Sequence, residues 1–472
     1  MSRAAASQLS FADWELMRQG LELEPLLRAI GDFLDDHGEL VARIGSDLRR
    51  GLKNPDTGRN GLTPHEVLRS VVLMRVKNWH YRELRERIAD GYTLRLFTGF
   101  LCRPVPRHKA FHRAFVRLTS ATLRTVNDLV VKAAVDLGLE DGAKLRVDTT
   151  VVQTDIHHPT DNTLLWDVVR VLTRLLRRLG KLLGRRIAGF CNRTRAARRR
   201  MQVIQRMSAR QRQSQQTSRY RELIGIAEQV VACGRLALEN PHNTHGKGLF
   251  CDLAIAGLHD DIRHYCDLGD RVIHQTRRRV IDGEQVSTAE KIYSIFEPHT
   301  DLIKRGKVRT PLEFGHKIFL AESANGLITQ YQVLRGNPAD EQHVGQSLGR
   351  HKKAFGRAPE LYSADRGFFS ERNLTQCRTS GVAAVCIPQS GGTRTPQREA
   401  HEKTPAFKQG QRFRAGIEGR ISVLFRGRGM KRCLAEGVER FELLVGTAVL
   451  ANNLMNIASL LMKRTPHPRR AA

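Results

Sequence analysis

The apolar and polar positions near the start of the chain repeat with the period of α-helices. The stretch from Thr63 to Glu66 is a capping box with proline at the first helical position, and apolar residues follow it at helical spacing. A second helix is expected to end at Gly91, and a long third helix is expected from about Lys109 to Leu137. We predict a helical region over residues 1–140, with no element assigned to the first 55.

After Lys144 the pattern becomes that of β-strands. The expected strands lie at residues 145–152, 315–321, 327–334, 361–364 and 382–387, with helices at 340–355 and 370–378. Asn325-Gly326 marks a tight hairpin between the second and third strands. Three strands that can form a meander, followed by strands that alternate with helices, predict a mixed α/β sheet.

A long helical excursion interrupts this predicted sheet after its first strand. Between Leu172 and Leu183, six leucines give one helix an apolar stripe, with arginine and lysine around it. The expected regions are an N-terminal helical region at 1–140, the first part of the core at 141–156, a basic helical insertion at 157–289, the rest of the core at 290–430, and a C-terminal helix with a basic tail at 431–472.

The charge of the chain indicates a polyanionic partner. Its 472 residues include 78 Lys and Arg against 48 Asp and Glu, a formal net charge of +30. From Arg170 to Arg221 there are 17 Lys and Arg and no acid, a stretch called the basic block below. A charge run is usually a solvated helical face, but repulsion at this density would go uncompensated unless phosphates supply the counter-charge. Nucleic acid is therefore favoured over an anionic membrane surface.

The basic helices at 1–140 are interpreted in the same way, as a DNA-binding region that can include a helix-turn-helix, although any basic helical domain shows this pattern. Asp13 and Glu15 stand where a signal peptide would be apolar, and no run reaches 18 uninterrupted apolar residues. Eight scattered cysteines without a C-x-x-C pair indicate reduced thiols. We expect a cytoplasmic, nucleoid-associated protein that does not span a membrane.

Three carboxylates are candidate metal ligands. Asp148 lies in the middle of the first predicted strand, where burial of a carboxylate is costly unless a cation pairs with it. Asp365 follows the fourth strand, the usual place for a site in an open α/β sheet, although an aspartate there is more often a helix cap. Glu418 follows an arginine by four residues on a predicted helix, as an exposed ion pair would. However, Gly416 and Gly419 flank it, which indicates close approach of nucleic acid or metal.

These residues resemble the three signatures of DDE-class insertion-sequence transposases. The matching segments are VDTTVV with Asp148, SADRGFF with Asp365, and RAGIE with Glu418. Segments at 157–167, 296–307 and 335–341 are similar to those of one bacterial branch, the ISNCY-like group. The resemblance covers roughly residues 60–460. It implies a ribonuclease H-like mixed sheet flanked by helices, with an N-terminal helical DNA-binding domain and the basic helical insertion after the first core strand.

The resemblance also implies a chemistry for the three acids. Asp148, Asp365 and Glu418 would coordinate two Mg²⁺ ions, for which Mn²⁺ can substitute. Two hard cations about 4 Å apart activate a water and stabilise the leaving oxygen during phosphodiester cleavage. The same site would activate the freed 3′-hydroxyl for attack on target DNA. The implied partners are the terminal inverted repeats of the element, target DNA and a second copy of the chain, in a homodimer or higher assembly on DNA.

The chain departs from the related transposase pattern at two positions. Gln411 stands where a tyrosine would precede Arg414 by three residues, and Phe425 stands where a basic residue would follow Glu418 by seven. Arg426 is the candidate substitute, about 80° further round the helix. The residues expected to contact DNA are Arg414, Arg426, Arg170, Arg174, Arg177, Arg178, Lys181, Arg185, Arg186, Arg198, Arg199 and Arg200.

Two other functions are compatible with the sequence. One is a ribonuclease H-like nuclease that cuts without strand transfer, and the other is a DNA-binding derivative of a transposase without activity. The presence of all three acids argues against the second, because a binding module does not need them. Trp166, at the entry to the insertion, is interpreted as a core residue rather than a platform for an unpaired base.

Overall fold

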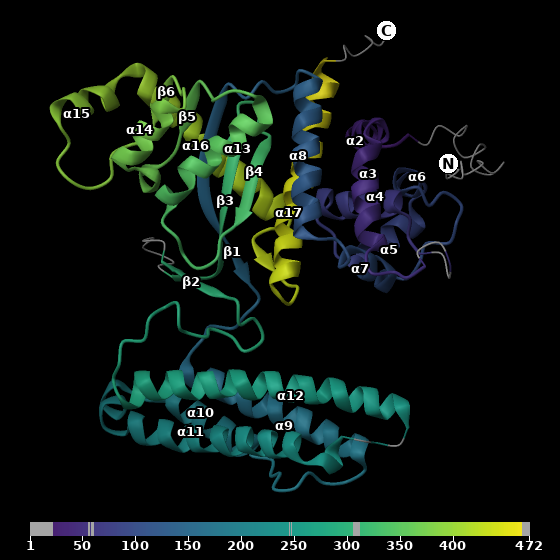
Figure 1. The fold of residues 1–472 in the computed structure, drawn as a ribbon, viewed down its shortest axis with the longest axis vertical. Helices are drawn as coiled ribbons and strands as arrows, with labels where there is room; N and C mark the ends of the chain where they lie inside the picture. The colour runs from purple at the N-terminus through teal and green to yellow at the C-terminus, as the bar shows by residue number, and fades with distance from the viewer. Residues whose placement is uncertain are drawn as a thin grey trace. The chain divides into compact units, whose positions relative to one another are not determined.

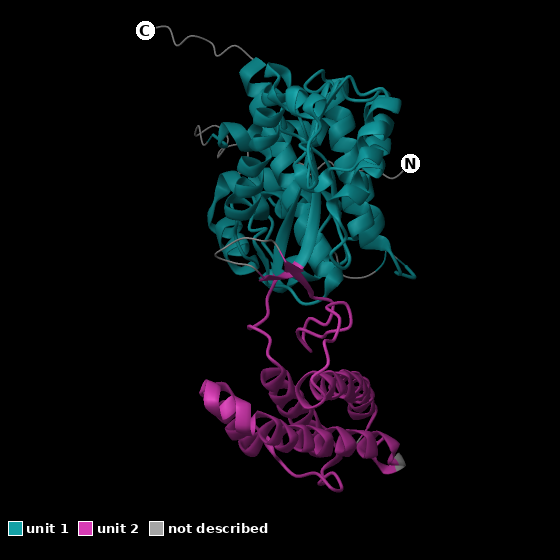
Figure 2. Cartoon of the chain, turned by 90° about the vertical axis from the view of Figure 1, so that its left-hand side faces the viewer, with its two compact units in different colours: residues 1–153, 316–472 teal, residues 154–315 magenta. Residues whose placement is uncertain are grey.

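The computed structural model describes residues 22–464 except 55–56, 58–60, 245, 247 and 305–311 (Figure 1). The predicted basic tail and the end of the 296–307 segment therefore lie outside the described residues. The chain divides into two compact units, of which the first comprises Met1–Gln153 with His316–Ala472 and the second Thr154–Gly315 (Figure 2).

Seven helices precede the first strand in the described residues. They are α2 (Pro25–Asp36), α3 (Gly38–Arg49), α4 (Pro64–Val76), α5 (Tyr81–Asp90), α6 (Tyr92–Thr98), α7 (His108–Phe115) and α8 (Ser120–Asp136). The capping box is confirmed, because the Glu66 backbone N–H donates to the Thr63 hydroxyl and the Thr63 N–H donates to the Glu66 carboxylate. The helical first region is thus confirmed, and α2 and α3 add two helices where none was predicted.

The predicted single helix from Lys109 to Leu137 is wrong. It is two helices, because α7 ends at Phe115 and Thr119 caps the start of α8 by accepting a hydrogen bond from the Thr122 N–H at 3.0 Å. The Asp47 carboxylate on α3 accepts from the Thr119 N–H at 2.7 Å and so fixes the break. A partner far away in the sequence decides where this helix begins.

The strands form the mixed sheet that the sequence predicted. They are β1 (Lys144–Thr154), β2 (Asp301–Lys304), β3 (Leu312–Ser323), β4 (Ile328–Val333), β5 (Leu361–Ser363), β6 (Ala384–Cys386) and β7 (Arg432–Cys433). The main order is β4-β3-β1-β5-β6; β7 also pairs with β1, and β2 pairs with the first residues of β3. β3 and β4 are an antiparallel hairpin that turns at Gly326 (φ 84°), whereas β1, β5 and β6 run parallel. The first strand in the sequence is therefore central.

Helices cover both faces of this sheet. The larger ones are α13 (Val344–Phe355), α14 (Glu371–Thr379), α15 (Pro396–Lys403), α16 (Pro405–Gly427) and α17 (Val438–Arg464), with short helices η3 (Asp340–His343) and η4 (Arg366–Phe368) between them. Phe319 of β3 packs in a cluster with α13 and α14, whereas its neighbour Ile318 packs with α16 and α17. Val147 of β1 belongs to the α13 cluster. Because side chains alternate along a strand, Asp148 faces the side that α16 covers.

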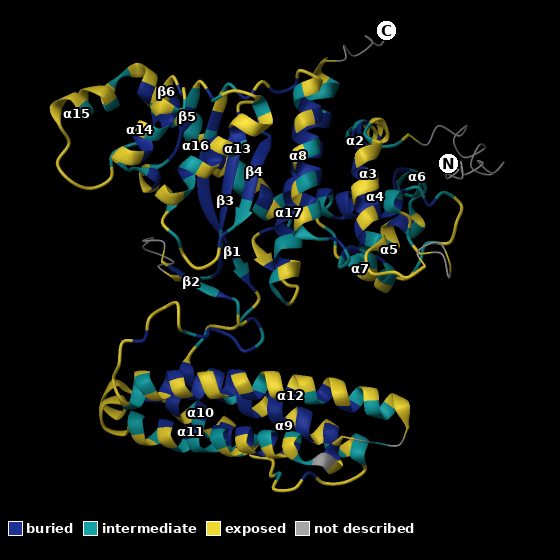
Figure 3. Cartoon of the chain, in the orientation of Figure 1, coloured by how far each residue is buried: buried dark blue, intermediate teal, exposed yellow. Residues whose placement is uncertain are grey.

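Helix α17 is long and apolar enough to cross a membrane, yet most of it is buried within its own chain (Figure 3). Its asparagines explain why. Asn453 accepts from the Ile328 N–H and donates to the Ile328 carbonyl, both at 2.9 Å, and Asn456 donates to the Asn325 carbonyl at 2.6 Å. These bonds fasten the β3–β4 hairpin to α17, which packs as a core helix.

The second unit is mostly helical, as predicted for the excursion. Its helices are α9 (Asp161–Leu183), α10 (Thr194–Arg206), α11 (Ala209–Glu239), α12 (Leu249–Thr276), and the short η1 (Pro241–Asn243) and η2 (Arg277–Ile281). The leucine stripe of α9 is confirmed, because Leu172, Leu176 and Leu179 are fully buried against α11 and α12. Trp166 packs, partly buried, against the same core.

Candidate active site

Asp148 on β1 and Asp365 just after β5 lie at matching positions along two neighbouring parallel strands. In the register of β1 and β5, Arg146 is opposite Ser363. Asp148 follows Arg146 by two residues, and Asp365 follows Ser363 by two residues. Neighbouring strands lie about 4.8 Å apart, so the two carboxylates are close although 217 residues separate them in the sequence. Asp148 is buried, with 7% of the residue exposed, and Asp365 caps η4 by accepting from the Gly367 N–H at 2.9 Å.

Glu418 reaches the same place from α16 through Arg414. The Arg414 guanidinium lies 2.9 Å from Glu418, 3.0 Å from Asp148 and 3.8 Å from Asp365, measured between the nearest nitrogen and oxygen atoms. The Arg414–Glu418 pair predicted along the helix is present, but it is not merely an exposed pair. One cation thus lies within ion-pair distance of all three predicted acids.

Asp340 is a fourth acid near this site that sequence reasoning did not select. It lies at the start of η3, within the segment 335–341, and accepts from the Thr149 hydroxyl at 3.0 Å and from the Lys317 ammonium at 3.2 Å. Its Oδ2 and the Oδ1 of Asp365 both lie about 3 Å from the point where a β-carbon on Gly367 would lie. The available signal was the position of Asp340 in the segment 335–341, which follows the third predicted strand.

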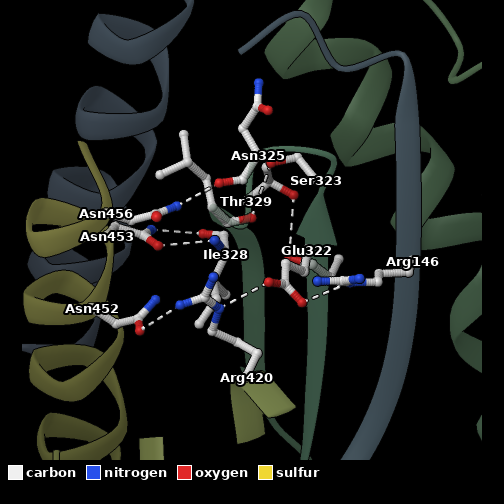
Figure 4. A network of polar contacts seen from close by, with 12 residues as sticks. Arg146, Glu322, Ser323, Asn325, Ile328, Thr329, Arg420, Asn452, Asn453 and Asn456 are labelled. Carbon is white, nitrogen blue, oxygen red and sulfur yellow. Dashed lines mark hydrogen bonds and ion pairs between the residues drawn. The ribbon is translucent and has the colours of Figure 1, made fainter. Parts of the chain in front are cut away.

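A buried ion-pair network holds α16 against β1. Glu322 of β3, which is fully buried, accepts from the Nε of Arg146 and from the Nε of Arg420, each at 2.8 Å (Figure 4). Arg146 also donates to the Phe413 carbonyl on α16 at 2.7 Å. Arg146 precedes Asp148 by two residues and Arg420 follows Glu418 by two, so this network positions two of the candidate acids.

The same network explains one of the two helical glycines. A β-carbon at Gly416 would collide with the guanidinium of Arg146, so an arginine of this chain makes the close approach that was predicted for nucleic acid or metal. Gly419 has open space beside it. The expected reason for Gly416 is therefore wrong, whereas that for Gly419 stays a prediction.

Gln411, which departs from the transposase pattern, and Arg426, the candidate substitute for the basic residue missing at Phe425, do not contribute to this cluster. The Gln411 amide donates to the carbonyls of Ala364 and Cys386, at 3.2 and 2.6 Å, and so ties α16 to β5 and β6. Arg426 donates to the Ser422 hydroxyl on its own helix at 2.7 Å and is exposed. In the structure, the substitute cation at Arg426 does not reach the three acids.

The carboxylates of this cluster are suitable ligands for a divalent metal, but in the structure they are not arranged around a metal site. Carboxylate oxygens are the ligands that Mg²⁺ prefers, and the cluster keeps an excess of negative charge. Within the described residues, however, no group of three or more His, Cys, Asp and Glu side chains is arranged to hold a metal ion. Arg414 stands between the acids, so a metal would have to displace its guanidinium.

The basic block gathers much of its charge on one surface of the second unit. Arg170, Arg174, Arg177, Arg178 and Lys181 line a depression of about 390 Å³ on α9, together with Asn192 and Thr194. The basic block was expected to have no acidic partners, and this expectation is wrong for three of its arginines. Arg170 pairs with Asp167, and Arg200 and Arg219 pair with Glu222, because acids just outside the block fold back onto it.

The fold and site together define a class of protein: a mixed α/β sheet fitting a ribonuclease H-like domain, with acids from two central strands and a covering helix. Residues 274–454 match the family model described as Transposase DDE domain. The match includes Asp365, Arg414 and Glu418 and supports a DDE-type transposase of an insertion element, a family of metal-dependent DNA-processing enzymes. Neither the comparison with curated proteins nor that with solved structures found a match.

Proposed function

We propose that the chain binds the terminal repeats of its own insertion sequence, cleaves DNA there, and joins the 3′ ends to target DNA. The observation that supports this most directly is the convergence of Asp148, Asp365 and Glu418 on a single guanidinium. Three acids from distant parts of the chain are held at one point, which a structural ion pair does not require. We place the chain in the ISNCY-like branch on its sequence segments.

Asp148, Asp365 and Glu418 are the residues that would hold two Mg²⁺ ions. When bound, such ions activate the attacking oxygen and stabilise the leaving oxygen of a phosphodiester. Arg414 keeps the three like charges together beforehand, since without it they would repel one another. If the acids held metal ions instead, the Arg414 guanidinium would be free to pair with a DNA phosphate, for which its planar donors suit it.

The second unit and the N-terminal helices are proposed to hold the DNA. The depression lined by Arg174, Arg177, Arg178 and Lys181 offers phosphate contacts, which carry no sequence information but fix the position of the duplex. Each chain has one set of the three acids, and two element ends must be cut together. We therefore propose a homodimer or higher assembly on DNA, in the cytoplasm at the nucleoid.

The deciding experiment measures cleavage and binding separately. Asp148→Asn, Asp365→Asn and Glu418→Gln are compared with wild type in nicking of labelled end DNA with Mg²⁺ or Mn²⁺, and in gel shifts of the same DNA. We expect each variant to lose cleavage and keep binding. Glu360→Gln, which breaks an exposed pair with Arg357, is the control and should cleave normally. Full cleavage by the Asp365 variant would refute the site.

The same reactions separate the alternatives. With a target plasmid present, joined products support a transposase, whereas nicks without joining would show a nuclease. Binding by the wild-type chain without any cleavage would show a silent DNA-binding derivative.

A further inference from the structure

A second cavity, of about 650 Å³, lies within the first unit, and none of the four acids described above lines it. It is enclosed by α4, the end of α7, the start of α17 and the loop that follows α16. Its wall combines three aromatic side chains, Trp79, Tyr81 and Phe115, with the arginines Arg75 and Arg440. Rings together with cations are unusual for a cavity that only separates packed helices.

Arg75 is a half-buried cation in this wall. Its Nε donates to the Thr447 hydroxyl at 3.0 Å, but in the described part of the chain no carboxylate pairs with it. Burial lowers the pKa of Arg75 below its ordinary value, since desolvation disfavours the charged form. Arg69, six residues earlier on α4, has such a partner, because its guanidinium lies 2.6 Å from the Asp35 carboxylate. Three arginines line the cavity against one acid, Glu436, and a cation held partly out of water without a counter-ion is costly. The cavity therefore favours an anionic ligand.

Three aromatic rings lie together in this wall. Tyr81 lies 5.6 Å from Phe115, centre to centre, and the two rings are tilted. Trp79 is partly exposed beside them in the cavity wall. Stacking on aromatic side chains with arginine at hand is how unpaired bases are held in proteins that bind single strands.

The cavity is joined to the helix that carries Glu418. Arg428, just beyond α16, donates to the Val76 carbonyl at the end of α4 at 2.8 Å, and Gly429 forms part of the cavity wall. Ten residues separate Glu418 from Arg428, which corresponds to about 15 Å along a helix. A DNA strand leaving the acids therefore needs only a few nucleotides to reach this cavity.

We propose that this cavity binds one unpaired nucleotide of the DNA substrate. The base stacks among Trp79, Tyr81 and Phe115, and its phosphate pairs with Arg75 and Arg440. This inference rests on the proposed function, in that DNA is the substrate, but it assigns a second site that takes single-stranded rather than duplex DNA.

The test uses the full chain with Trp14→Phe and Trp166→Phe, because the sequence has three tryptophans and Trp79 then becomes the sole indole. The oligonucleotide (dT)12 and a blunt duplex are titrated in EDTA while indole fluorescence is recorded. We expect (dT)12 to quench Trp79 and the duplex to leave it nearly unchanged. Unchanged fluorescence at saturating (dT)12 would overturn the proposal.

Variants in the same background locate the binding. Tyr81→Leu should weaken (dT)12 binding at least about fivefold, the lower limit for loss of one stacked base. Arg75→Gln should weaken it as well, because the phosphate loses a cation. Arg82→Gln, at an exposed arginine on α5, should change it less than about twofold. Equal weakening by Arg75→Gln and Arg82→Gln would show general attraction to positive charge and refute the site. Thermal unfolding shows whether each variant is folded. If a variant does not fold, quenching of Trp79 in the parent chain still tests the proposal.

The fluorescence assay needs no metal and no cleavage, so its result can contradict the nucleotide cavity without contradicting the proposed function. Quenching without nicking of end DNA would refute the transposase activity alone. Nicking without quenching would refute the nucleotide cavity alone.

Discussion

The guanidinium of Arg414 on α16 lies 3.0 Å from the carboxylate of Asp148 in the central strand, 266 residues earlier in the chain. The same guanidinium reaches Asp365 and Glu418. Like charges that would repel are thus assembled around one cation before any other ligand arrives.

Arg414→Gln should destabilise the protein in EDTA by about 2 kcal/mol, because the buried Asp148 carboxylate loses its cation. The same variant should gain more stability from added Mn²⁺ than wild type does, since the guanidinium no longer competes for the acids. Urea denaturation with and without Mn²⁺ measures both effects. Equal stabilisation of the two proteins by Mn²⁺ would contradict competition between Arg414 and the metal.

Glu322→Gln should destabilise the first unit by about 3–5 kcal/mol, because Arg146 and Arg420 then face a neutral group in a buried site. Cleavage should fall together with stability, since Asp148 and Glu418 lose their common support. Glu360→Gln, which breaks the exposed pair with Arg357, should cost less than about 1 kcal/mol. Urea denaturation of all three proteins decides the matter, and similar losses for the two variants would contradict a supporting role of Glu322.

His351 should make the protein less stable in mild acid. It is fully buried on α13 and stacks on Phe355, and desolvation lowers its pKa from 6.5 to about 4. The unfolded chain therefore binds a proton below pH 6.5 while the folded chain does not, so stability falls between pH 6.5 and 4. Between pH 7.5 and 5, wild type should lose about 2 kcal/mol more than His351→Leu.

Denaturant titrations at the two pH values measure this difference. His80→Gln, at an exposed position, is the control and should follow wild type. Identical pH dependence of wild type and His351→Leu would show that His351 contributes nothing to acid sensitivity.

Replacing Arg174, Arg177, Arg178 and Lys181 by glutamine should flatten the dependence of log affinity for end DNA on log salt by about 3, since each lost phosphate contact removes about 0.9 from the slope. Arg200→Gln with Arg219→Gln should change the slope less, because Glu222 already compensates those arginines. An unchanged slope in the fourfold variant would mean that this surface faces solvent in the complex.

If the proposed function is correct, the DNA ends of the element should not be closed as hairpins. The Gln411 amide is used by the carbonyls of Ala364 and Cys386, and the Phe413 ring lies 4.8 Å from the Arg146 guanidinium, so neither offers a platform for a flipped base. Trp166 packs on the core of the second unit. The cavity at Trp79 is too far from Glu418 to hold the base beside the cleaved bond. Denaturing gels of labelled end duplex should show nicked and joined strands, and a covalently closed tip would prove this wrong.

Local features of the sequence determined most of the elements. The capping box at Thr63, the Asn325-Gly326 hairpin and the β-branched run around Asp148 are each specified within a few residues, because backbone geometry, capping and side-chain alternation act at short range. The positions of Asp148 within a strand and Asp365 just after one followed from the same patterns. The resemblance of three short segments to transposase signatures then grouped the three acids into one site. Periodicity alone does not predict that grouping.

Only the tertiary structure decided how these parts meet. The order of the sheet sets Asp148 beside Asp365, and the packing of α16 brings Arg414 onto both. Gly416 is explained by Arg146, 270 residues away, and the break before α8 by Asp47. Asp340 and the cavity at Arg75 carry no periodic signal at all. Such contacts depend on which surfaces are buried together, and burial is a property of the whole fold rather than of any window of sequence.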